Sequence, residues 1–260
     1  MSVCDLVIMG AGGRMGSTLT GLIAGDHDCR LAGVVERPQN AQSLDRYDCL
    51  KSISLEDLLP RLPGAVVVDF TAPEASLATA HAAARMGNPA VIGTTGFSPE
   101  QMKELEKAAA HTPMFWTPNM SVGINALLAV LPILAEKLGP TYDLEIMEIH
   151  HNKKADSPSG TALKLGQQLA ASRGKSLDEL KVCCREGIIG PRGQGEIGLQ
   201  AIRGGDVAGD HTVYFLGLGE RIEVTHRAHS RETFARGALR AAKWLVGQKA
   251  GKLYGMPDML

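Results

Sequence analysis

The sequence predicts an α/β protein with a doubly wound N-terminal domain on a parallel sheet and an α+β second domain with a mixed sheet. Three observations predict this fold class. In the first half, short β-branched runs alternate with helical patterns, as in parallel sheets covered on both faces. The first run leads into a glycine-rich turn and then a helix. In the second half, strand-like runs with glycine-rich connections follow one another, which suits an antiparallel or mixed sheet.

The elements of the first half are expected in regular alternation. Each helical segment has the apolar spacing of an amphipathic helix. Ser98 and Pro99 offer an N-cap followed by a proline at the first helical position. We expect strands at residues 6–9, 31–35, 65–70, 90–92 and 114–116, and helices at residues 14–24, 55–59, 73–86 and 99–111.

The pattern changes after about residue 121, where a second region begins. An apolar helix is followed by a long strand, and no flexible linker separates the two regions. We therefore expect two closely coupled domains. Helices are expected at residues 123–138, 162–171 and 231–246, and strands at residues 143–150, 197–203, 211–215 and 221–227.

Charge and cysteine content exclude several classes of function. With 27 Lys and Arg against 28 Asp and Glu, the formal net charge is -1, so no global field attracts nucleic acid or an anionic membrane. The partner is expected to be a small molecule. Five cysteines without a CxxC spacing argue against a disulfide framework and a zinc ribbon, and favour a reducing compartment.

No targeting or membrane segment is expected either. The longest apolar stretch, residues 124–135, is shorter than the roughly 20 residues that cross a bilayer. The N-terminus carries Asp5 and no Lys or Arg ahead of its first apolar run, so it lacks the basic region of a secretory signal. We expect a cytoplasmic protein.

The glycine-rich turn spans Gly10, Ala11, Gly12, Gly13, Arg14, Met15 and Gly16. Strand, turn and helix in this order place free N–H groups and the positive helix end where a pyrophosphate binds in a Rossmann domain. Gly10 would permit the tight turn, and Gly12 or Gly13 the close approach of a phosphate. Gly16 would let the helix pack closely on the strand. The alternative is a glycine-rich turn that binds nothing.

Glu36 and Arg37 close the second expected strand, Glu36 lying 20 residues after Gly16. At this separation an acidic side chain meets the adenosine ribose hydroxyls of a bound dinucleotide. The carboxylate favours NAD, whereas the neighbouring guanidinium can pair with a 2′-phosphate. The pair therefore predicts the use of both NADH and NADPH.

Two further loops follow strand ends on the same side of the expected sheet. They contain Gly93, Thr94 and Thr95 in one loop and Thr117, Pro118, Asn119 and Met120 in the other. Ligands of doubly wound folds bind at this side. Both loops offer small polar groups for a ribose and a carboxamide, although each alone is also compatible with an ordinary turn.

Residues 148–162 hold the densest chemistry in the chain. If the extended backbone persists past His150, alternation places His150, Asn152 and Lys154 on one face, where His150 and Lys154 could address one ligand. Histidine titrates near neutrality and can donate a proton to an atom that becomes basic as hydride arrives. Lysine supplies a positive charge or a second proton.

A helix N-terminus is expected directly after these residues. The N–H groups of Gly160 and Thr161 should point out of it, as an anion site suited to a substrate carboxylate. The alternative is a solvated loop with a capped helix. His150 or His151 with the cysteine pair 183–184, or His226 with His229, lack the local spacing of metal ligands, so we expect no metal.

The chain closely resembles the 4-hydroxy-tetrahydrodipicolinate reductase family, also called dihydrodipicolinate reductase, of the diaminopimelate route to lysine. Motifs along the whole length carry the resemblance. They are the GAGGRMG loop, Glu36-Arg37, Asp69-Phe70-Thr71, residues 93–96 and 118–123, the HHNKKADSPSGTA run, and residues 203–206 and 223–228.

The resemblance implies NAD(P)H-dependent reduction of the dihydropyridine-type intermediate to tetrahydrodipicolinate. It implies that His150 donates the proton, that Lys154 assists, and that His151, Gly160 and Thr161 hold the substrate carboxylates. It implies nucleotide contacts at Gly10, Ala11, Gly12, Gly13, Arg14, Met15, Glu36, Arg37, Gly93, Thr94, Thr95, Thr117, Pro118, Asn119 and Met120. Met120 departs from the aromatic residue that is common in the family, and Ser157 from a common alanine.

The resemblance also implies an organisation. Residues 1–121 would form the dinucleotide-binding domain and residues 122–231 the substrate-binding and oligomerisation domain. Residues 232–260 would return to the first domain, and homotetramers would assemble through the second sheet. Two other functions stay open from the residues alone: a reductase or dehydrogenase of another small amino-dicarboxylate, and a nucleotide-binding sensor without catalysis.

Overall fold

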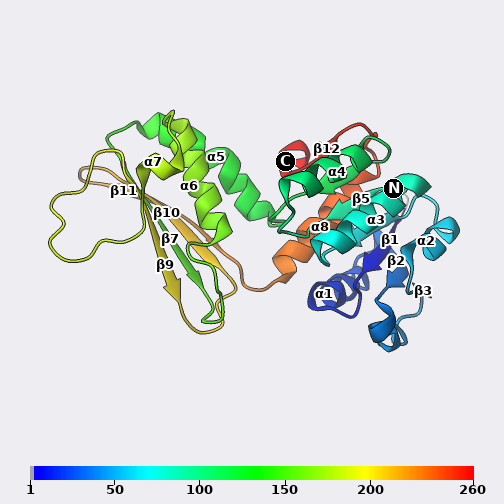
Figure 1. The fold of residues 1–260 in the computed structure, drawn as a ribbon. Helices are drawn as coiled ribbons and strands as arrows, with labels where there is room; N and C mark the ends of the chain where they lie inside the picture. The colour runs from blue at the N-terminus through cyan, green and yellow to red at the C-terminus, as the bar shows by residue number, and fades with distance from the viewer. Residues whose placement is uncertain (1–2) are drawn as a thin grey trace. The chain divides into compact units, whose positions relative to one another are not determined.

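The computed structural model describes residues 3–260, which divide into two compact units. Unit 1 comprises residues 1–122 and 231–260, and unit 2 comprises residues 123–230 (Figure 1). Within the described residues, no helix is long and apolar enough to cross a membrane. Each unit is built on one sheet.

Unit 1 contains a parallel sheet of seven strands in the order β12-β6-β5-β4-β1-β2-β3. Apart from β12, this is the strand order of a Rossmann domain, which confirms the predicted fold class. The order reverses direction between β1 and β4, where such folds bind their ligands. The strands are β1 (Cys4–Met9), β2 (Cys29–Val35), β3 (Leu50–Ser52), β4 (Val66–Asp69), β5 (Ala90–Ile92), β6 (Met114–Trp116) and β12 (Leu253–Tyr254).

Helices cover both faces of this sheet, because the central strands β1 and β4 carry buried apolar residues on both sides. Leu6 and Ile8 of β1 face a core with helices α1 and α8, whereas Val7 between them faces α2, α3 and α4. The helices are α1 (Arg14–Ile23), α2 (Leu55–Leu58), α3 (Pro73–Met86), α4 (Pro99–Ala109), α8 (Glu232–Leu245) and α9 (Met256–Met259), with short 3-10 turns at Pro38–Leu44 and Leu59–Arg61.

Unit 2 contains a five-stranded sheet in the order β11-β10-β7-β9-β8. Strand β10 pairs antiparallel with β7 and β11, whereas β9 pairs parallel with β7 and β8, so the sheet is mixed, as predicted. The strands are β7 (Asp143–His150), β8 (Lys181–Val182), β9 (Ile197–Arg203), β10 (Asp210–Leu216) and β11 (Arg221–Arg227).

Helices cover one face of the second sheet. The helices α5 (Val122–Leu138), α6 (Gly160–Ser172) and α7 (Leu177–Leu180) pack on Leu144 and Ile146 of β7 (Figure 1). By alternation Glu148 and His150 share this face. The opposite face carries no helix within the described part of unit 2, and Ile202 on it is 45% exposed.

Three strands were not predicted from the sequence: β3, β8 and β12. They contain only two or three residues each, too few to show an alternating pattern. Each joins an existing sheet at or near its edge, so the pairing comes from the neighbouring strand rather than from the segment itself.

Candidate active site

The glycine-rich turn has the geometry that its sequence predicts. Gly10 has φ +61, and the N–H of Gly13 donates to the Gly10 carbonyl at 2.9 Å, which makes the turn tight. A Cβ at Gly16 would lie 2.3 Å from the Gly10 carbonyl oxygen, so only glycine lets α1 begin here. Gly13 caps α1 without a side-chain bond, and no acidic residue occupies the first turn. This end of α1 can therefore bind an anion.

Glu36 reaches from the end of β2 to this turn. Its side chain is 6% exposed and accepts hydrogen bonds from the N–H of Gly12 at 3.1 Å and of Arg37 at 2.9 Å. The Arg37 side chain is exposed, with its Nε 3.9 Å from the carboxylate. The Ser43 hydroxyl is buried beside Gly12 with no hydrogen-bond partner among the described residues. Sequence reasoning had not identified Ser43.

A buried carboxylate joins the loops after β4 and β5. Asp69 is fully buried, and its Oδ1 accepts from the Thr71 N–H and hydroxyl, both at 2.7 Å, and from the Ser76 hydroxyl at 3.0 Å. Ser76 in turn lies 2.7 Å from the Thr94 hydroxyl. Asp69 therefore fixes Thr94, a predicted nucleotide contact. The sequence placed Asp69 at a strand end, but it gave no sign of this hydrogen-bond network.

The two other predicted loops also follow strand ends of unit 1. Gly93 leaves room for the Phe70 ring, which a Cβ would approach within 2.1 Å, and Thr95 after it is exposed. In the next loop the Thr117 hydroxyl donates to the Asn119 carbonyl at 3.1 Å, and Pro118 is exposed. The side chain of Met120 is 2% exposed within the core, so only its backbone is available to a ligand.

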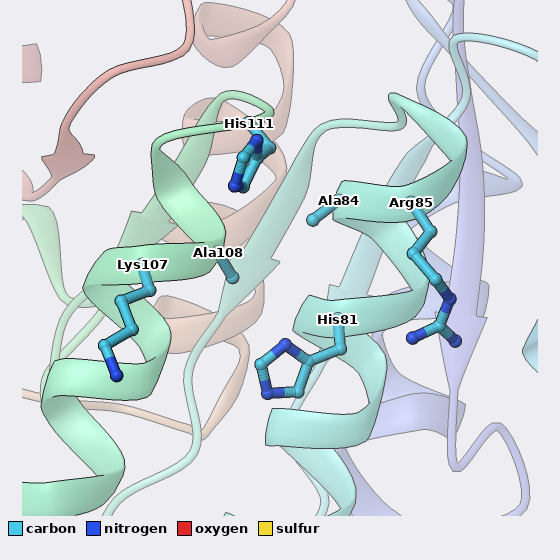
Figure 2. Close-up of a pocket in the computed structure, with 6 residues that line it drawn as sticks. All are labelled: His81, Ala84, Arg85, Lys107, Ala108 and His111. Atoms are coloured by element: carbon cyan, nitrogen blue, oxygen red, sulfur yellow. The ribbon is translucent and has the colours of Figure 1, made fainter.

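A hollow between α3 and α4 is a separate feature of unit 1 (Figure 2). It is lined by His81, Arg85, Lys107 and His111 together with two alanines. Arg85 and Lys107 lie in the last turns of α3 and α4, where basic groups stabilise helix C-termini. His81 lies one turn earlier in α3. Arg85 pairs with Glu56, and Lys107 with Glu104. The hollow therefore has no part in the candidate site.

In unit 2, His150 ends β7 with one ring nitrogen facing a buried carboxylate. Its Nδ1 lies 2.5 Å from Oε2 of Glu148, whose side chain is 1% exposed. Burial raises the pKa of Glu148, but hydrogen bonds from Arg203, His150 and the Ser159 N–H together hold this pKa below its ordinary value. Glu148 is therefore ionised, and Nδ1 must be the donor.

The other ring nitrogen of His150 is open. No protein partner of Nε2 occurs within residues 3–260, and the side chain is 11% exposed. Gly209 lies beside this atom, where a Cβ would come within 3.0 Å of Nε2. The glycine keeps the nitrogen accessible.

A second histidine lies against His150 without sharing its chemistry. The ring centroids of His211 and His150 are 5.2 Å apart in a T-shaped arrangement, and His211 Nε2 lies 3.0 Å from the Ser159 hydroxyl. Burial, followed by the charge of His150, lowers the pKa of His211 to about 4. His211 is therefore neutral at neutral pH. No local sequence signal identifies His211, because it comes from a different strand from His150.

Helix α6 begins at Gly160, two residues before the expected helical pattern. Ser159 is its N-cap and accepts from the Ala162 N–H at 3.1 Å. No acidic side chain lies in the first turn, so the positive end of α6 can attract an anion near Gly160 and Thr161.

The prediction that the extended backbone persists past His150 is wrong. The strand ends at His150, and a turn follows in which the N–H of Lys154 donates to the His151 carbonyl at 3.2 Å. Alternation therefore does not place Asn152 or Lys154. The Lys154 ammonium bonds to Asp156 at 2.7 Å and, by this hydrogen bond, lowers the pKa of the Asp156 carboxyl.

His151 and the question of a metal site remain among the predicted groups. The ring Nδ1 of His151 accepts from the Lys153 N–H at 3.2 Å, and the backbone N–H of His151 donates to the Val207 carbonyl. Across the described residues, no group of three or more His, Cys, Asp or Glu side chains is arranged to hold a metal ion.

Comparison with known proteins assigns the chain to one family over nearly its whole length. Residues 4–120 match the family model described as dihydrodipicolinate reductase, N-terminus, and residues 123–260 match that of its C-terminus. A 4-hydroxy-tetrahydrodipicolinate reductase of Oleidesulfovibrio alaskensis is 61% identical over 260 residues, all of both chains. The enzyme of that name from Lawsonia intracellularis is 49% identical over 98% of this chain and 99% of its own.

A solved structure shares the fold. The dipicolinate-bound dihydrodipicolinate reductase from Paenisporosarcina sp. TG-14 superposes with a TM-score of 0.81 at 24% identity, covering 99% of this chain and 100% of the other.

Proposed function

Because this chain belongs to the dihydrodipicolinate reductase family, we propose that it reduces 4-hydroxy-tetrahydrodipicolinate to tetrahydrodipicolinate with NADH or NADPH, in diaminopimelate and lysine biosynthesis. The chain is an NAD(P)H-dependent oxidoreductase. The observation that carries the proposed reaction is a histidine whose Nδ1 faces a buried carboxylate and whose Nε2 is open, in the same unit as a helix whose first turn carries no acidic side chain.

Unit 1 fits the nicotinamide nucleotide. Its tight turn, the uncapped end of α1 and the buried carboxylate of Glu36 suit a pyrophosphate and a ribose. The unpartnered Ser43 hydroxyl is one further polar group beside them. Bound there, the reduced nucleotide would supply a hydride from C4 of its nicotinamide. The proposed nucleotide contacts are Gly10 to Met15, Glu36, Arg37, Gly93, Thr94, Thr95 and Thr117 to Met120.

His150 is the proposed proton donor. Since Nδ1 donates to Glu148, the proton that can leave is the one on Nε2 of the imidazolium. The substrate takes up one hydride and this proton and loses one water, which balances the reaction. His150 then regains a proton from solvent.

Lys154 and the start of α6 are proposed to hold the substrate. Two carboxylates must be neutralised, and Lys154 would exchange Asp156 for one of them. The N–H groups at Gly160 and Thr161, with His151, would bind carboxylate oxygens. Charge-assisted bonds of this kind are the strong ones.

Turnover of the substrate tests the reaction. Loss of NADH or NADPH absorbance would be followed with the intermediate generated by its synthase. We expect His150→Ala and Lys154→Ala each to lower kcat/KM by about 10²-fold or more. His81→Ala, in the hollow of unit 1, should leave it unchanged. Losses below about threefold in the first two variants would contradict the assigned roles.

Use of both nucleotides is proposed from Glu36 and Arg37. The buried carboxylate suits the ribose hydroxyls of NADH, and the exposed guanidinium is free to turn towards a 2′-phosphate. Comparison of kcat/KM for NADH and NADPH tests this. A preference above about a thousandfold, roughly 4 kcal/mol, would mean that one of the two side chains is not at the ribose.

We also propose a cytoplasmic homotetramer assembled through the second sheet. The family resemblance supports this assembly, and Ile202, which is 45% exposed on the face of that sheet without a helix, is the position at which we test it. Light scattering should give the mass of a tetramer, and Ile202→Asp should reduce it. A monomeric wild-type protein would rule out the assembly. Cell fractionation tests the location.

A further inference from the structure

Glu148 receives hydrogen bonds from three different elements. His150 Nδ1 and the Ser159 N–H lie 2.5 and 3.0 Å from its two oxygens. Arg203 of β9 closes the set with a two-point contact, Nη1 to Oε2 and Nη2 to Oε1, both at 2.7 Å. A buried carboxylate with this many donors has one orientation available to it.

Arg203 also contacts the segment that carries Lys154. Its register partner in the parallel pairing of β9 with β7 is His150 itself. Its Nη2 donates to the backbone carbonyl of Asp156 at 2.8 Å, and Asp156 binds Lys154 through its carboxylate. One guanidinium therefore touches the carboxylate behind His150 and the backbone two residues after Lys154.

We propose that Glu148 and Arg203 are positioning residues for the reduction: Arg203 fixes Glu148, and Glu148 fixes His150 with Nδ1 inward and Nε2 towards the substrate. This inference rests on the proposed function of His150. It adds the groups that decide which ring nitrogen delivers the proton.

The physical reason is the acceptor-only nature of an ionised carboxylate. Against Glu148 the neutral imidazole must carry its proton on Nδ1, and the imidazolium is stabilised by the adjacent negative charge. An amide at this position can also donate, so both tautomers become possible and the charge is lost. Orientation of a histidine by a buried carboxylate is worth several orders of magnitude in other enzymes.

The surroundings of His150 contain few other groups that could replace this effect. On its own strand it meets Glu148, from β9 Arg203, and from β10 the neutral His211. Lys154 lies in the turn that follows the strand. Glu148 is thus the anionic group in direct contact with the ring.

A matched pair on the opposite face of β7 provides a control. Glu145 receives a similar two-point contact from Arg185, with Nη1 and Nη2 at 3.0 and 2.8 Å. Alternation directs Glu145 away from His150. If the two-point contact of an arginine with a glutamate of β7 mattered only for folding, substitution of Arg203 and of Arg185 would change kcat alike.

The experiment compares Glu148→Gln, Arg203→Lys and Arg185→Lys in the full-length protein. We expect Glu148→Gln to lower kcat about 10²-fold with KM within about threefold, and Arg203→Lys to lower kcat about tenfold. Arg185→Lys should change both by less than about twofold in protein whose mass by light scattering equals that of the wild type, since Glu145 lies on the face of the sheet proposed for assembly. In Glu148→Gln the alkaline limb of the kcat/KM profile should move to lower pH, because the acid form loses its anionic partner.

A double variant and an NMR measurement separate the proposed positioning role from a loss of folding. The double variant Glu148→Gln, Arg203→Met removes both charges, so it should fold even where the single change leaves an unpaired buried charge, and should show the same loss of kcat. Nitrogen NMR of the free protein should find neutral His150 protonated at Nδ1 in the wild type and at both nitrogens in Glu148→Gln.

The outcomes separate this inference from the proposed function. Unchanged kcat and pH profile in Glu148→Gln, or equal losses in Arg185→Lys and Arg203→Lys, would overturn the positioning role while the reductase activity stands. A wild-type protein without turnover would overturn the proposed function. In that case the NMR comparison would still decide whether Glu148 sets the tautomer.

Discussion

The two units present their functional groups in opposite ways. In unit 1 the candidate nucleotide site offers backbone N–H groups at the turn before α1, where Gly10 and Gly16 have no side chains. In unit 2 the candidate site consists of ionisable side chains, Glu148 and His150 among them, that are buried and paired. A backbone site fails when a side chain intrudes, whereas a buried charge network fails when one partner or one proton is changed.

The largest effect is expected where a side chain enters the turn of unit 1. Gly16→Ala would place a Cβ 2.3 Å from one backbone oxygen and 2.7 Å from the Ala11 Cα, so α1 cannot keep its position. We expect NADH binding to weaken more than about 10³-fold, roughly 4 kcal/mol. Nucleotide fluorescence titration measures this.

Gly21→Ala in the same helix is the matched control, because nothing lies within 4 Å of its Cβ position. It should leave binding unchanged and stabilise the protein by about 0.5–1 kcal/mol. If both alanine variants bound NADH normally, the nucleotide would not depend on this turn.

The next effect is a pH dependence that belongs to unit 2. His211 has its pKa lowered from 6.5 to about 4, so the unfolded chain binds its proton first as the pH falls. The contribution of neutral His211 to the free energy of unfolding is therefore full above pH 6.5. It is lost as the pH falls from 6.5 to 4, by up to roughly 3 kcal/mol. The free energy of unfolding, measured with urea and circular dichroism, should depend less on pH in His211→Gln than in the wild type.

Tryptophan fluorescence sharpens this test, since both tryptophans of the chain, Trp116 and Trp244, lie in unit 1. The fluorescence transition should shift less between pH 7 and 4 than the dichroism transition. The pKa of His226 in unit 2 is also lowered by burial, so some pH dependence should remain in the variant. An identical pH dependence in wild type and His211→Gln would contradict the assignment.

The smallest effect compares two serine N-caps. Ser98 caps α4 in unit 1 within a capping box, and Ser159 caps α6 in unit 2 while also contacting His211. Alanine at either position should lower the free energy of unfolding by about 1 kcal/mol. Only Ser159→Ala should also lower kcat/KM, by about tenfold. Equal kcat/KM in the two variants would show that α6 contributes no more than stability.

The sequence predicted the elements of both units where local patterns are strong. Residues 90–92 and 114–116 were expected as strands with the bounds that β5 and β6 have. Helix α6 begins two residues before the expected pattern because Ser159 is its N-cap. The strands β3, β8 and β12 escaped prediction because they lack a three-residue apolar run like those of β5 and β6, so their pairing depends on a neighbour.

The residues of the candidate site likewise fall into those with a local sequence signal and those that strand pairing brings together. Glycine spacing and the acidic residue after β2 are local signals, so the turn and Glu36 could be proposed from the sequence. His150 stood out by its neighbours in the chain. Arg203 and His211 could not be identified in the same way, since they follow Glu148 by 55 and 63 positions and meet it only through strand register.

The sequence by itself determined the fold class and the family and pointed to a candidate reactive segment, because hydrophobic period, glycine turns and family motifs follow from the order of residues along the chain. Only the tertiary structure decided where the backbone turns after His150, which nitrogen of that ring faces the protein, and which groups hold it. The physical reason is that a buried carboxylate is satisfied by donors from separate strands and a helix end, and the pairing of those elements sets each distance.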